Sequence, residues 1–459
     1  MSYVYQAIED FAFEWERSEN KGRFIDYDLS SMPKDCRQLD DLVLKLYDEC
    51  KLSKLVQASG VKTIHNAEMR LKNDLKSILW NLFRAQRHAR DCYLRISLST
   101  HSFMPRSQGN PFGISRYVPK IVRLLEDARM INLCIGFDDR KSGVSRFTRF
   151  RASLDLIKCL RFLPKEISVL YVEKPSIEFR CDLKIGAKKT SKPFNSQKFD
   201  EVENIVRHQN MLLSTRSITL GSSGREFLEW KDKKGNSHIS DLTKKSITAI
   251  FHVNPDNSVC YGRMHGGFWQ NIPSAYRKHI YIDGMPTVEL DYSAQILSMA
   301  ASHSKRQIDG DLYDIDLGLE ILGSNVQRSV VKFCIVIMLN SNSMKSALAA
   351  VRKKISDEKI LAGSGVTLTN LTIEAFYRII ILHYPFLRKY AFNGLGKMFF
   401  YHDSEIARSI LKAFIALNKV VLPIHDGFIV AEEDGELLHR TMSDAWSEKF
   451  GTNIYIKKE

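Results

Sequence analysis

The second half of the chain contains a strand and a hairpin that each carry an aspartate at one end. Apolar residues dominate Thr287–Ser293, which predicts a strand ending at Asp291, and a helical pattern follows it. The apolar run Val420–Val430 is interrupted by His-Asp-Gly, which predicts a tight β-hairpin with Asp426 at its tip. Both aspartates also have a purely structural interpretation, because Asp291 could cap the next helix and Asp426 could be a turn residue.

A third segment lies between these two and presents two cations. Arg328 and Lys332 are four residues apart, so in a helix they share one face. The residues from Val336 to Leu339 are apolar, so we expect the helix to be buried beyond its cationic end. Charges at one end of a half-buried helix indicate a site that faces inward, although a solvated face is the alternative.

The first half of the chain is predicted to be mostly helical at its start. Apolar residues recur at helical spacing in Leu42–Gln57 and Met69–Ala89. A further helix is predicted from Ser115 to Met130, and strands follow at Ile131–Phe137 and Arg146–Arg151.

This last helix and its two strands resemble a winged-helix module. The helix would face a major groove of DNA, which makes Arg123 a candidate contact, and the basic hairpin would lie along the backbone, which makes Arg146 another. A helix followed by a hairpin also occurs in many folds that do not bind DNA, so that alternative stays open.

The net charge of the chain indicates the kind of partner that it binds. The chain has 459 residues and a formal net charge of +14, with ordinary hydrophobic and charged fractions of 44% and 26%. A surplus of this size favours a polyanionic partner, nucleic acid before membrane, because no basic amphipathic anchor segment stands out. A well-solvated basic surface is the simpler alternative.

Cysteine spacing and hydropathy indicate a cytoplasmic protein. The eight cysteines are scattered with no C-x-x-C pair, which suits neither a zinc site nor a disulfide framework. We expect no secretory signal in the acidic first ten residues, and no stretch approaches the length of apolar chain that spans a membrane.

The polar residues of the second half fall in a distinctive order. In sequence they are Gly262-Arg263, Gln270-Asn271-Ile272-Pro273, Asp291-Tyr292-Ser293, Asp311-Leu312-Tyr313-Asp314-Ile315, Arg328-x-x-x-Lys332 and His425-Asp426. This order resembles the palm and fingers of family A DNA polymerases and of their single-subunit phage-type RNA polymerase relatives. The resemblance covers residues 260–459 only.

The resemblance implies a right-hand polymerase palm and fingers in the second half. With the patterns of the first half, it leads us to expect an α+β fold in four parts. These are an N-terminal helical region (1–105), a winged-helix-like DNA-binding module (106–165), a connector or thumb-like region (166–259), and a palm with short fingers (260–459). The chain before residue 260 lacks the paired acidic motifs of a proofreading exonuclease, so we expect none.

The resemblance also implies a two-metal site. Phosphoryl transfer needs positioning and charge neutralisation more than covalent chemistry. Asp291 and Asp426 would be the catalytic metal ligands for two Mg²⁺ ions, for which Mn²⁺ could substitute. These ions would activate a 3′-hydroxyl and stabilise the leaving pyrophosphate.

The remaining matched positions would contact substrates. Arg328 and Lys332 would bind the triphosphate, and Tyr292, Ile296 and Asn340 occupy other positions of the nucleotide site. The positions that would contact the primer and template are Arg263, Gln270, Asn271 and His425, with Gln270 and Asn271 supporting the palm as an alternative.

Because the chain departs from the family pattern at three positions, the choice between deoxyribonucleotides and ribonucleotides stays open. Ile296 stands where DNA-making members usually have an acidic residue, and Asn340 stands where both branches usually have a tyrosine. Gly427 replaces the glutamate of DNA polymerases or the serine of phage-type RNA polymerases.

We therefore expect a template-directed nucleotide polymerase that works on DNA and nucleoside triphosphates without a membrane, in the cytoplasm and on the nucleoid if bacterial. DNA synthesis for a replicon or mobile element is the favoured role. The alternatives are a phage-type RNA polymerase or primase, and a DNA-binding initiator or regulator with a non-catalytic palm.

Overall fold

The structure is a computed structural model. It describes residues 23–29, 31–57, 64–89, 91–103, 112–139, 144–164, 166–171, 175–181, 196–221, 225–232, 235–253, 259–308, 310–318, 323–361, 364, 366 and 368–459.

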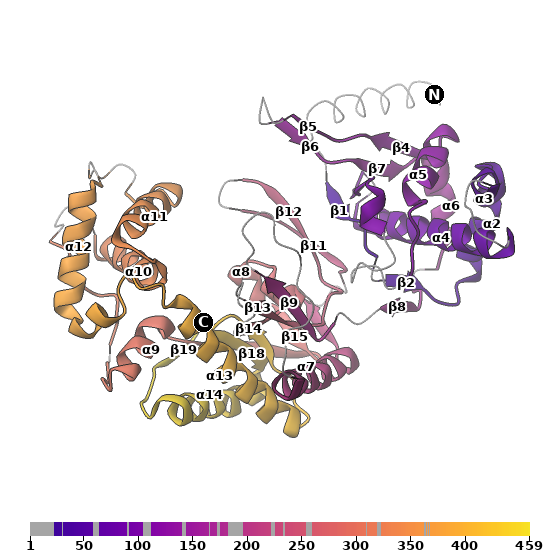
Figure 1. Cartoon of the computed structure of the whole chain (residues 1–459). Helices are drawn as coiled ribbons and strands as arrows, with labels where there is room; N and C mark the ends of the chain where they lie inside the picture. Colours follow the sequence, from indigo (N-terminus) through magenta and orange to yellow (C-terminus); the bar gives the residue numbers. More distant parts are fainter. Residues whose placement is uncertain are drawn as a thin grey trace. The chain divides into compact units, whose positions relative to one another are not determined.

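The chain forms two compact units that both mix helices and sheets (Figure 1). The first unit comprises residues 1–174 and 226–241, and the second comprises residues 175–225 and 242–459. The expected α+β class is confirmed. The division into four parts stays a prediction.

The first unit contains a four-stranded sheet of order β1-β3-β7-β4 and three two-stranded pairings, β2 with β8, β5 with β6, and β11 with β12. Its helices are α2 (Arg37–Glu49), α3 (Lys54–Gln57), α4 (Ile64–His88), η1 (Thr100–Phe103), α5 (Val118–Asp127) and α6 (Leu154–Leu160). Its strands are β1 (Phe24–Asp26), β2 (Ser31–Pro33), β3 (Tyr93–Arg95), β4 (Ile131–Cys134), β5 (Phe137–Asp139), β6 (Val144–Arg146), β7 (Arg149–Ala152), β8 (Val169–Tyr171), β11 (Phe227–Lys231) and β12 (Ser237–Asp241).

Helix α5 is shorter than the helix predicted from Ser115 to Met130. Pro119 lies in its first turn, where a proline is tolerated, and the chain leaves the helical conformation at Arg129, whose φ is +59°. Its apolar face is buried through Val118, Ile121 and Leu125, as the periodicity predicted. The strands that follow pair as one antiparallel hairpin, β4 with β7 and β5 with β6.

A buried arginine attaches the β11–β12 hairpin to the rest of the first unit. Arg84 of α4 is 1% exposed, and its guanidinium lies 3.2 Å from the Asp28 carboxylate and 2.9 Å from the Asp241 carboxylate. Glu226, at the start of the hairpin, lies 3.6 Å away. Because a buried charge must be paired to be tolerated, this cluster fixes the hairpin against α4.

The second unit contains a six-stranded sheet of order β10-β15-β16-β18-β17, in which β19 also pairs with β16, and a three-stranded sheet of order β14-β13-β9. Its strands are β9 (Ile177–Cys181), β10 (Ile218–Leu220), β13 (Thr248–Val253), β14 (Val259–His265), β15 (Ile280–Ile282), β16 (Met285–Tyr292), β17 (Leu422–Ile424), β18 (Gly427–Ala431) and β19 (Ile456–Lys458). Its helices are α7 (Ser196–Thr215), η2 (Phe268–Gln270), α8 (Ser274–Arg277), α9 (Gln295–His303), α10 (Ser324–Asn340), α11 (Met344–Asp357), α12 (Asn370–His383), η3 (Pro385–Lys389), α13 (Gly396–Ala416), η4 (Glu432–Asp434) and α14 (Gly435–Phe450).

Helices α10, α11 and α12 pack together as a group of their own within the second unit (Figure 1). The predicted strand and hairpin are present as β16 and as β17 with β18, and the predicted cationic helix is present as α10. Val330, Val331, Met338 and Leu339 are fully buried, as expected for a helix that is buried beyond its first turns.

In the part of the chain that the structure describes, no helix is both long and apolar enough to cross a membrane. The six cysteines whose state the structure gives, Cys36, Cys50, Cys92, Cys134, Cys159 and Cys334, are all free thiols.

Replacing the buried arginine tests its role in the first unit. Arg84→Met keeps most of the side-chain volume but leaves Asp28 and Asp241 buried without a cation, so we expect a loss of about 3–5 kcal/mol in the free energy of unfolding. Hydrogen exchange of α4 and β11–β12 peptides in increasing urea would measure it. Arg87→Met is the matched control, because Arg87 is 42% exposed and its ion pair with Glu226 should contribute about 1 kcal/mol or less.

Candidate active site

The two predicted carboxylates lie side by side in the second unit. Strands β16 and β18 are antiparallel, and their register sets Asp291 opposite Gly427, next to Asp426. The Tyr292 amide donates to the Asp426 carbonyl at 3.4 Å. A Cβ atom at Gly427 would lie 2.9 Å from the Leu290 carbonyl oxygen, so close strand packing restricts this position to glycine.

Asp291 is in an environment that disfavours its charge. Burial, and then the negative charge of Asp426, raise the pKa of Asp291 to about 7, against the opposing effect of Lys457. One of its oxygens, Oδ2, lies 3.3 Å from the Lys457 ammonium. The other, Oδ1, is buried and has no hydrogen-bond partner among the residues that the structure describes.

A buried carboxylate oxygen without a partner is unusual and needs a physical reason. A divalent cation between the carboxylates would supply the missing partner and relieve their repulsion, so the residues present fit Mg²⁺. The described residues contain no group of three or more His, Cys, Asp or Glu side chains able to hold a metal. Mg²⁺ asks for only one or two carboxylates when substrate phosphates supply the rest.

The two cations predicted on the helix contact one tyrosine ring, and Arg328 lines the same cavity as Lys457, the partner of Asp291. Arg328 and Lys332 of α10 both lie over the Tyr313 ring, at 5.5 and 5.9 Å from its centroid. Arg328 also donates to Asp311 at 2.5 Å. Burial raises the pKa of Tyr313, and so does the charge of Asp426, which places this ring within electrostatic range of the carboxylate pair.

Arg263 forms an ion pair inside the protein. Its Nε lies 2.7 Å from the Asp403 carboxylate of α13, and its guanidinium lies over the Phe400 ring. Gln295 donates to the other oxygen of Asp403 at 3.0 Å. Burial raises the pKa of Asp403 to about 6, although Arg263 and Gln295 oppose this shift. Arg263 remains 22% exposed at its side chain.

One face of the three-stranded sheet carries basic and imidazole side chains. The register pairs His252 with Arg180, Ile250 with Arg263, and Thr248 with His265, so these residues share a face. Burial, followed by the charges of Arg263 and His425, lowers the pKa of His265 to about 4. His425 takes a left-handed conformation in the tight turn, with φ of +47°, and burial lowers its pKa also.

Gln270 and Asn271 have partners within the fold. Gln270 donates to the Pro423 carbonyl at 2.8 Å and to the Met264 carbonyl at 3.1 Å, which ties η2 to strand β17. Asn271 donates to the carbonyls of Gly266 and Gly267. These bonds fit the alternative in which the two residues support the sheet that holds Asp426.

Three other predicted nucleotide contacts lie in different settings. Tyr292 is 1% exposed and its hydroxyl donates to the Met442 carbonyl, so only its backbone could reach a nucleotide. Ile296 lies in the first turn of α9 and is half-buried. Asn340 ends α10, where its side chain donates to the Val336 carbonyl and packs against Gly396.

The predicted DNA contacts belong to the first unit. Arg123 is exposed on the outer face of α5. Arg146 ends β6 opposite Phe137, and its side chain lies outside the described residues. Their role in binding DNA stays a prediction.

Three groups of this site were not among the residues predicted to act in it. Lys457 pairs with Asp291, Asp403 pairs with Arg263, and Tyr313 underlies the two cations of α10. Asp403 and Lys457 had no sequence signal, because each contacts a residue more than a hundred positions away. Tyr313 lies in the acidic segment Asp311–Ile315, which the motif order had singled out.

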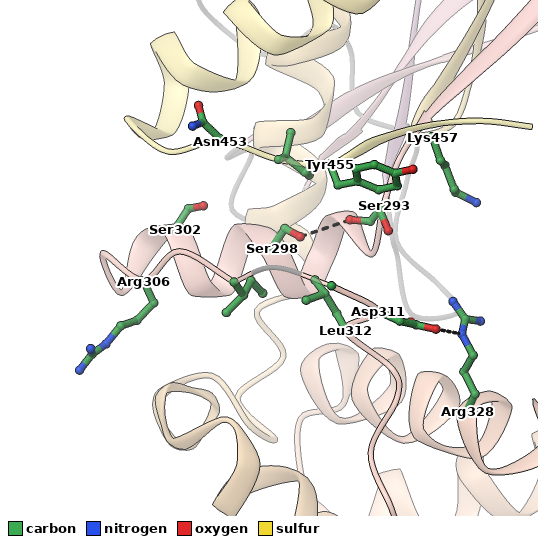
Figure 2. A pocket seen from close by; sticks show the side chains of 13 residues that line it. Ser293, Ser298, Ser302, Arg306, Asp311, Leu312, Arg328, Asn453, Tyr455 and Lys457 are labelled. Atoms are coloured by element: carbon green, nitrogen blue, oxygen red, sulfur yellow. Dashed lines mark hydrogen bonds and ion pairs between the residues drawn. The ribbon is translucent and has the colours of Figure 1, made fainter. Parts of the chain in front are cut away.

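A cavity of about 550 Å³ is lined by Lys457, the ion-pair partner of Asp291, and by Arg328. Figure 2 shows it between helix α9, the loop that leads to Asp311, and the C-terminal segment from Asn453 to Lys457. Asp311 and Arg328 line the end of the cavity at which Lys457 lies.

The raised pKa of Asp403 predicts a pH-dependent stability. The pKa of Asp403 is higher in the folded protein than in the unfolded chain. Its contribution to the free energy of unfolding is therefore present at low pH and is lost as the pH rises through about 6. Asp403→Asn cannot ionise, so its stability relative to the wild type should rise by about 1–2 kcal/mol between pH 5 and 7.5. Urea unfolding at both pH values measures this. The exposed Asp444→Asn should show no such change. If the free energy of unfolding of Asp403→Asn differed from that of the wild type by the same amount at both pH values, the raised pKa of Asp403 would be contradicted.

No family model matches this chain, and no curated protein matches its sequence. Among solved structures, a similar chain is the POL domain of Pol1 from M. smegmatis in complex with DNA primer-template and dNTP, at 12% identity and a TM-score of 0.31. The match covers 56% of this chain and 51% of that one, so the chain spans about half the length of the matched structure. A TM-score this low supports no conclusion about fold or function.

Proposed function

We propose that the second unit is a nucleotide polymerase that extends a 3′-hydroxyl with nucleoside triphosphates. The observation that carries this proposal is the position of Asp291 beside Asp426. Asp291 on β16 lies next to Asp426 in the β17–β18 turn, and the negative charge of Asp426 contributes to the raised pKa of Asp291. Such an arrangement disfavours the cation-free state and suits a site that binds divalent cations.

Asp291 and Asp426 would hold two Mg²⁺ ions, with Mn²⁺ as a substitute. When bound, the ions would supply activation of the attacking hydroxyl and stabilisation of the leaving pyrophosphate. The buried Oδ1 of Asp291 gives one ligand atom that accepts no hydrogen bond from any described residue. Lys457 balances part of the negative charge from the other oxygen.

Arg328 and Lys332 would bind the triphosphate. Both lie over the Tyr313 ring, and the charges of Asp426 and Asp291 contribute to the raised pKa of Tyr313. Arg328 can form paired hydrogen bonds to phosphate oxygens after exchanging its bond to Asp311. The ring holds the two cations from beneath, so they are positioned before the substrate arrives.

The basic face of the three-stranded sheet would hold the primer and template. Arg263 and His425 border it, and Arg180 and His265 extend it. In the first unit, α5 with the β4–β7 hairpin would act as a winged-helix module that binds duplex DNA. The exposed Arg123 of α5 would contact the phosphate backbone or a base edge.

In this proposal the sheet of β16, β17 and β18 is the palm, and α10, α11 and α12 are the fingers. The enzyme would lack a proofreading exonuclease and would act in the cytoplasm. DNA synthesis for a replicon or mobile element is the favoured process, and incorporation assays with both nucleotide types would identify the sugar.

Removing either carboxylate tests the proposal directly. We expect Asp291→Asn and Asp426→Asn each to reduce primer extension on the order of 10³-fold, because each removes a charge that a cation needs. Extension of a 5′-overhang duplex with Mg²⁺ or Mn²⁺ and either dNTPs or NTPs is the measurement. Asp444→Asn, an exposed change of the same kind on α14, should retain activity.

Thermal unfolding adds a readout that does not depend on turnover. Mg²⁺ should raise the melting temperature of the wild type further than triphosphate alone does, and this Mg²⁺-dependent gain should vanish in Asp291→Asn. A wild type that binds DNA but extends no primer under any of these conditions would favour the initiator or regulator alternative.

The winged-helix assignment has its own prediction. Arg123→Ala should weaken duplex binding and reduce the dependence of log K on log salt by about one unit, as expected for one lost phosphate contact. Fluorescence anisotropy at several salt concentrations measures both quantities. Arg161→Ala, an equally exposed change at the end of α6, is the control. Equal affinity and an equal salt slope for the Arg123 variant and the wild type would rule the contact out.

A further inference from the structure

The cavity lined by Arg328 and Lys457 has the size of a small-molecule site. Its volume is about 550 Å³, within the range of about 300–1,000 Å³ that ligand pockets occupy. Ser293, Ser298 and Ser302 lie along its α9 side, and the C-terminal segment from Asn453 to Lys457 forms the facing side (Figure 2). It therefore extends along α9 well beyond the carboxylates.

One end of the cavity suits phosphate groups. Arg328 and Lys457 line this end and come from different elements, with side chains 44% and 41% exposed. The first turn of α9 begins beside Ser293, and its cap residue Ala294 has no side-chain bond to the helix amides. Arg328 is paired with Asp311, and Lys457 with Asp291 and Glu459, so both cations would exchange these partners for phosphate oxygens. Together with the start of α9 they form an anion-binding end.

The remainder of the cavity suits a planar ring. Ile308, Leu312 and Ile454 give it apolar walls, and Tyr455 exposes 70% of its surface. Figure 2 shows Tyr455 on the same segment as Lys457, between it and Asn453. An exposed aromatic ring beside an anion-binding end can stack a nucleobase while the cations hold its phosphates.

The far end provides polar groups that the fold does not use. Arg306 forms no ion pair with any residue that the structure describes, and the side-chain amide of Asn453 has no hydrogen-bond partner among them. Figure 2 shows both at the end of α9 away from Arg328. Their donors can reach the edge of a base or its ribose.

We propose that this cavity binds a nucleoside oligophosphate, with the phosphates at Arg328 and Lys457 and the base against Tyr455. This site is separate from the one in which a templated nucleotide would react, although both share Arg328. A nucleotide in the cavity therefore competes for a cation that the triphosphate needs, and it inhibits extension. Binding itself requires neither metal nor template.

Calorimetric titration of the full chain with ATP in EDTA tests this site. The wild type should bind ATP, whereas adenosine and inorganic tripolyphosphate should each bind about tenfold more weakly, because each lacks one half of the contacts. Tyr455→Ser should weaken ATP binding about tenfold, and Tyr455→Phe should retain it because the ring is kept. Tripolyphosphate binding should be the same in both variants.

A second pair of variants keeps the test independent of Tyr455. Arg306→Gln should weaken ATP binding about fivefold, and the adjacent Lys305→Gln, which does not line the cavity, should leave it unchanged. The inference would be overturned if the wild type bound no ATP. It would also be overturned if Tyr455→Ser and Arg306→Gln both bound ATP with the affinity of the wild type. Asp426→Ala separates it from the polymerase proposal, since this variant should lose extension and still bind ATP in EDTA.

Discussion

The pairing of β16 with β18 is the constraint on which the candidate site depends. It sets Asp291 opposite Gly427 and so brings Asp426 beside it, in a place where burial already penalises negative charge. The surrounding fold maintains this arrangement. Trp269 and Gln270 both donate to the Pro423 carbonyl at the start of the hairpin, and Arg277 holds Glu289 of β16 through two hydrogen bonds. Two partly buried carboxylates side by side disfavour folding, so the strand register must be maintained by contacts of this kind.

The elements of the site could be predicted from the sequence because their signals are local. Strand β16 follows from its apolar run, and the β17–β18 hairpin follows from a short polar interruption between two apolar segments. Helix α10 follows from two cations at helical spacing before an apolar stretch. The first and last residues of a helix are harder to predict, as α5 shows, because the end of a helix depends on single residues such as Arg129.

The partners of these residues could not be predicted, because they come from distant parts of the chain. Arg263 precedes Asp403 by 140 residues, and nothing in either segment indicates their ion pair. Arg84 and Asp241 are 157 residues apart, and together they attach a hairpin from the middle of the chain to the rest of the first unit. A pattern of polarity fixes which face of an element is buried, but it does not identify what covers that face.

Lys457 bears on whether the carboxylate pair serves catalysis or only the fold. A scaffold without turnover would be more stable with an amide at position 291, because the repulsion from Asp426 would disappear. Lys457 offsets part of that repulsion, yet it also pairs with Glu459 and is 41% exposed. If a divalent cation took its place at Asp291, Lys457 would keep Glu459 and water as partners, so little free energy opposes the exchange. A carboxylate pair balanced by a cation that is easily released suits a site that binds and releases metal and substrate, more than it suits a permanent ion pair.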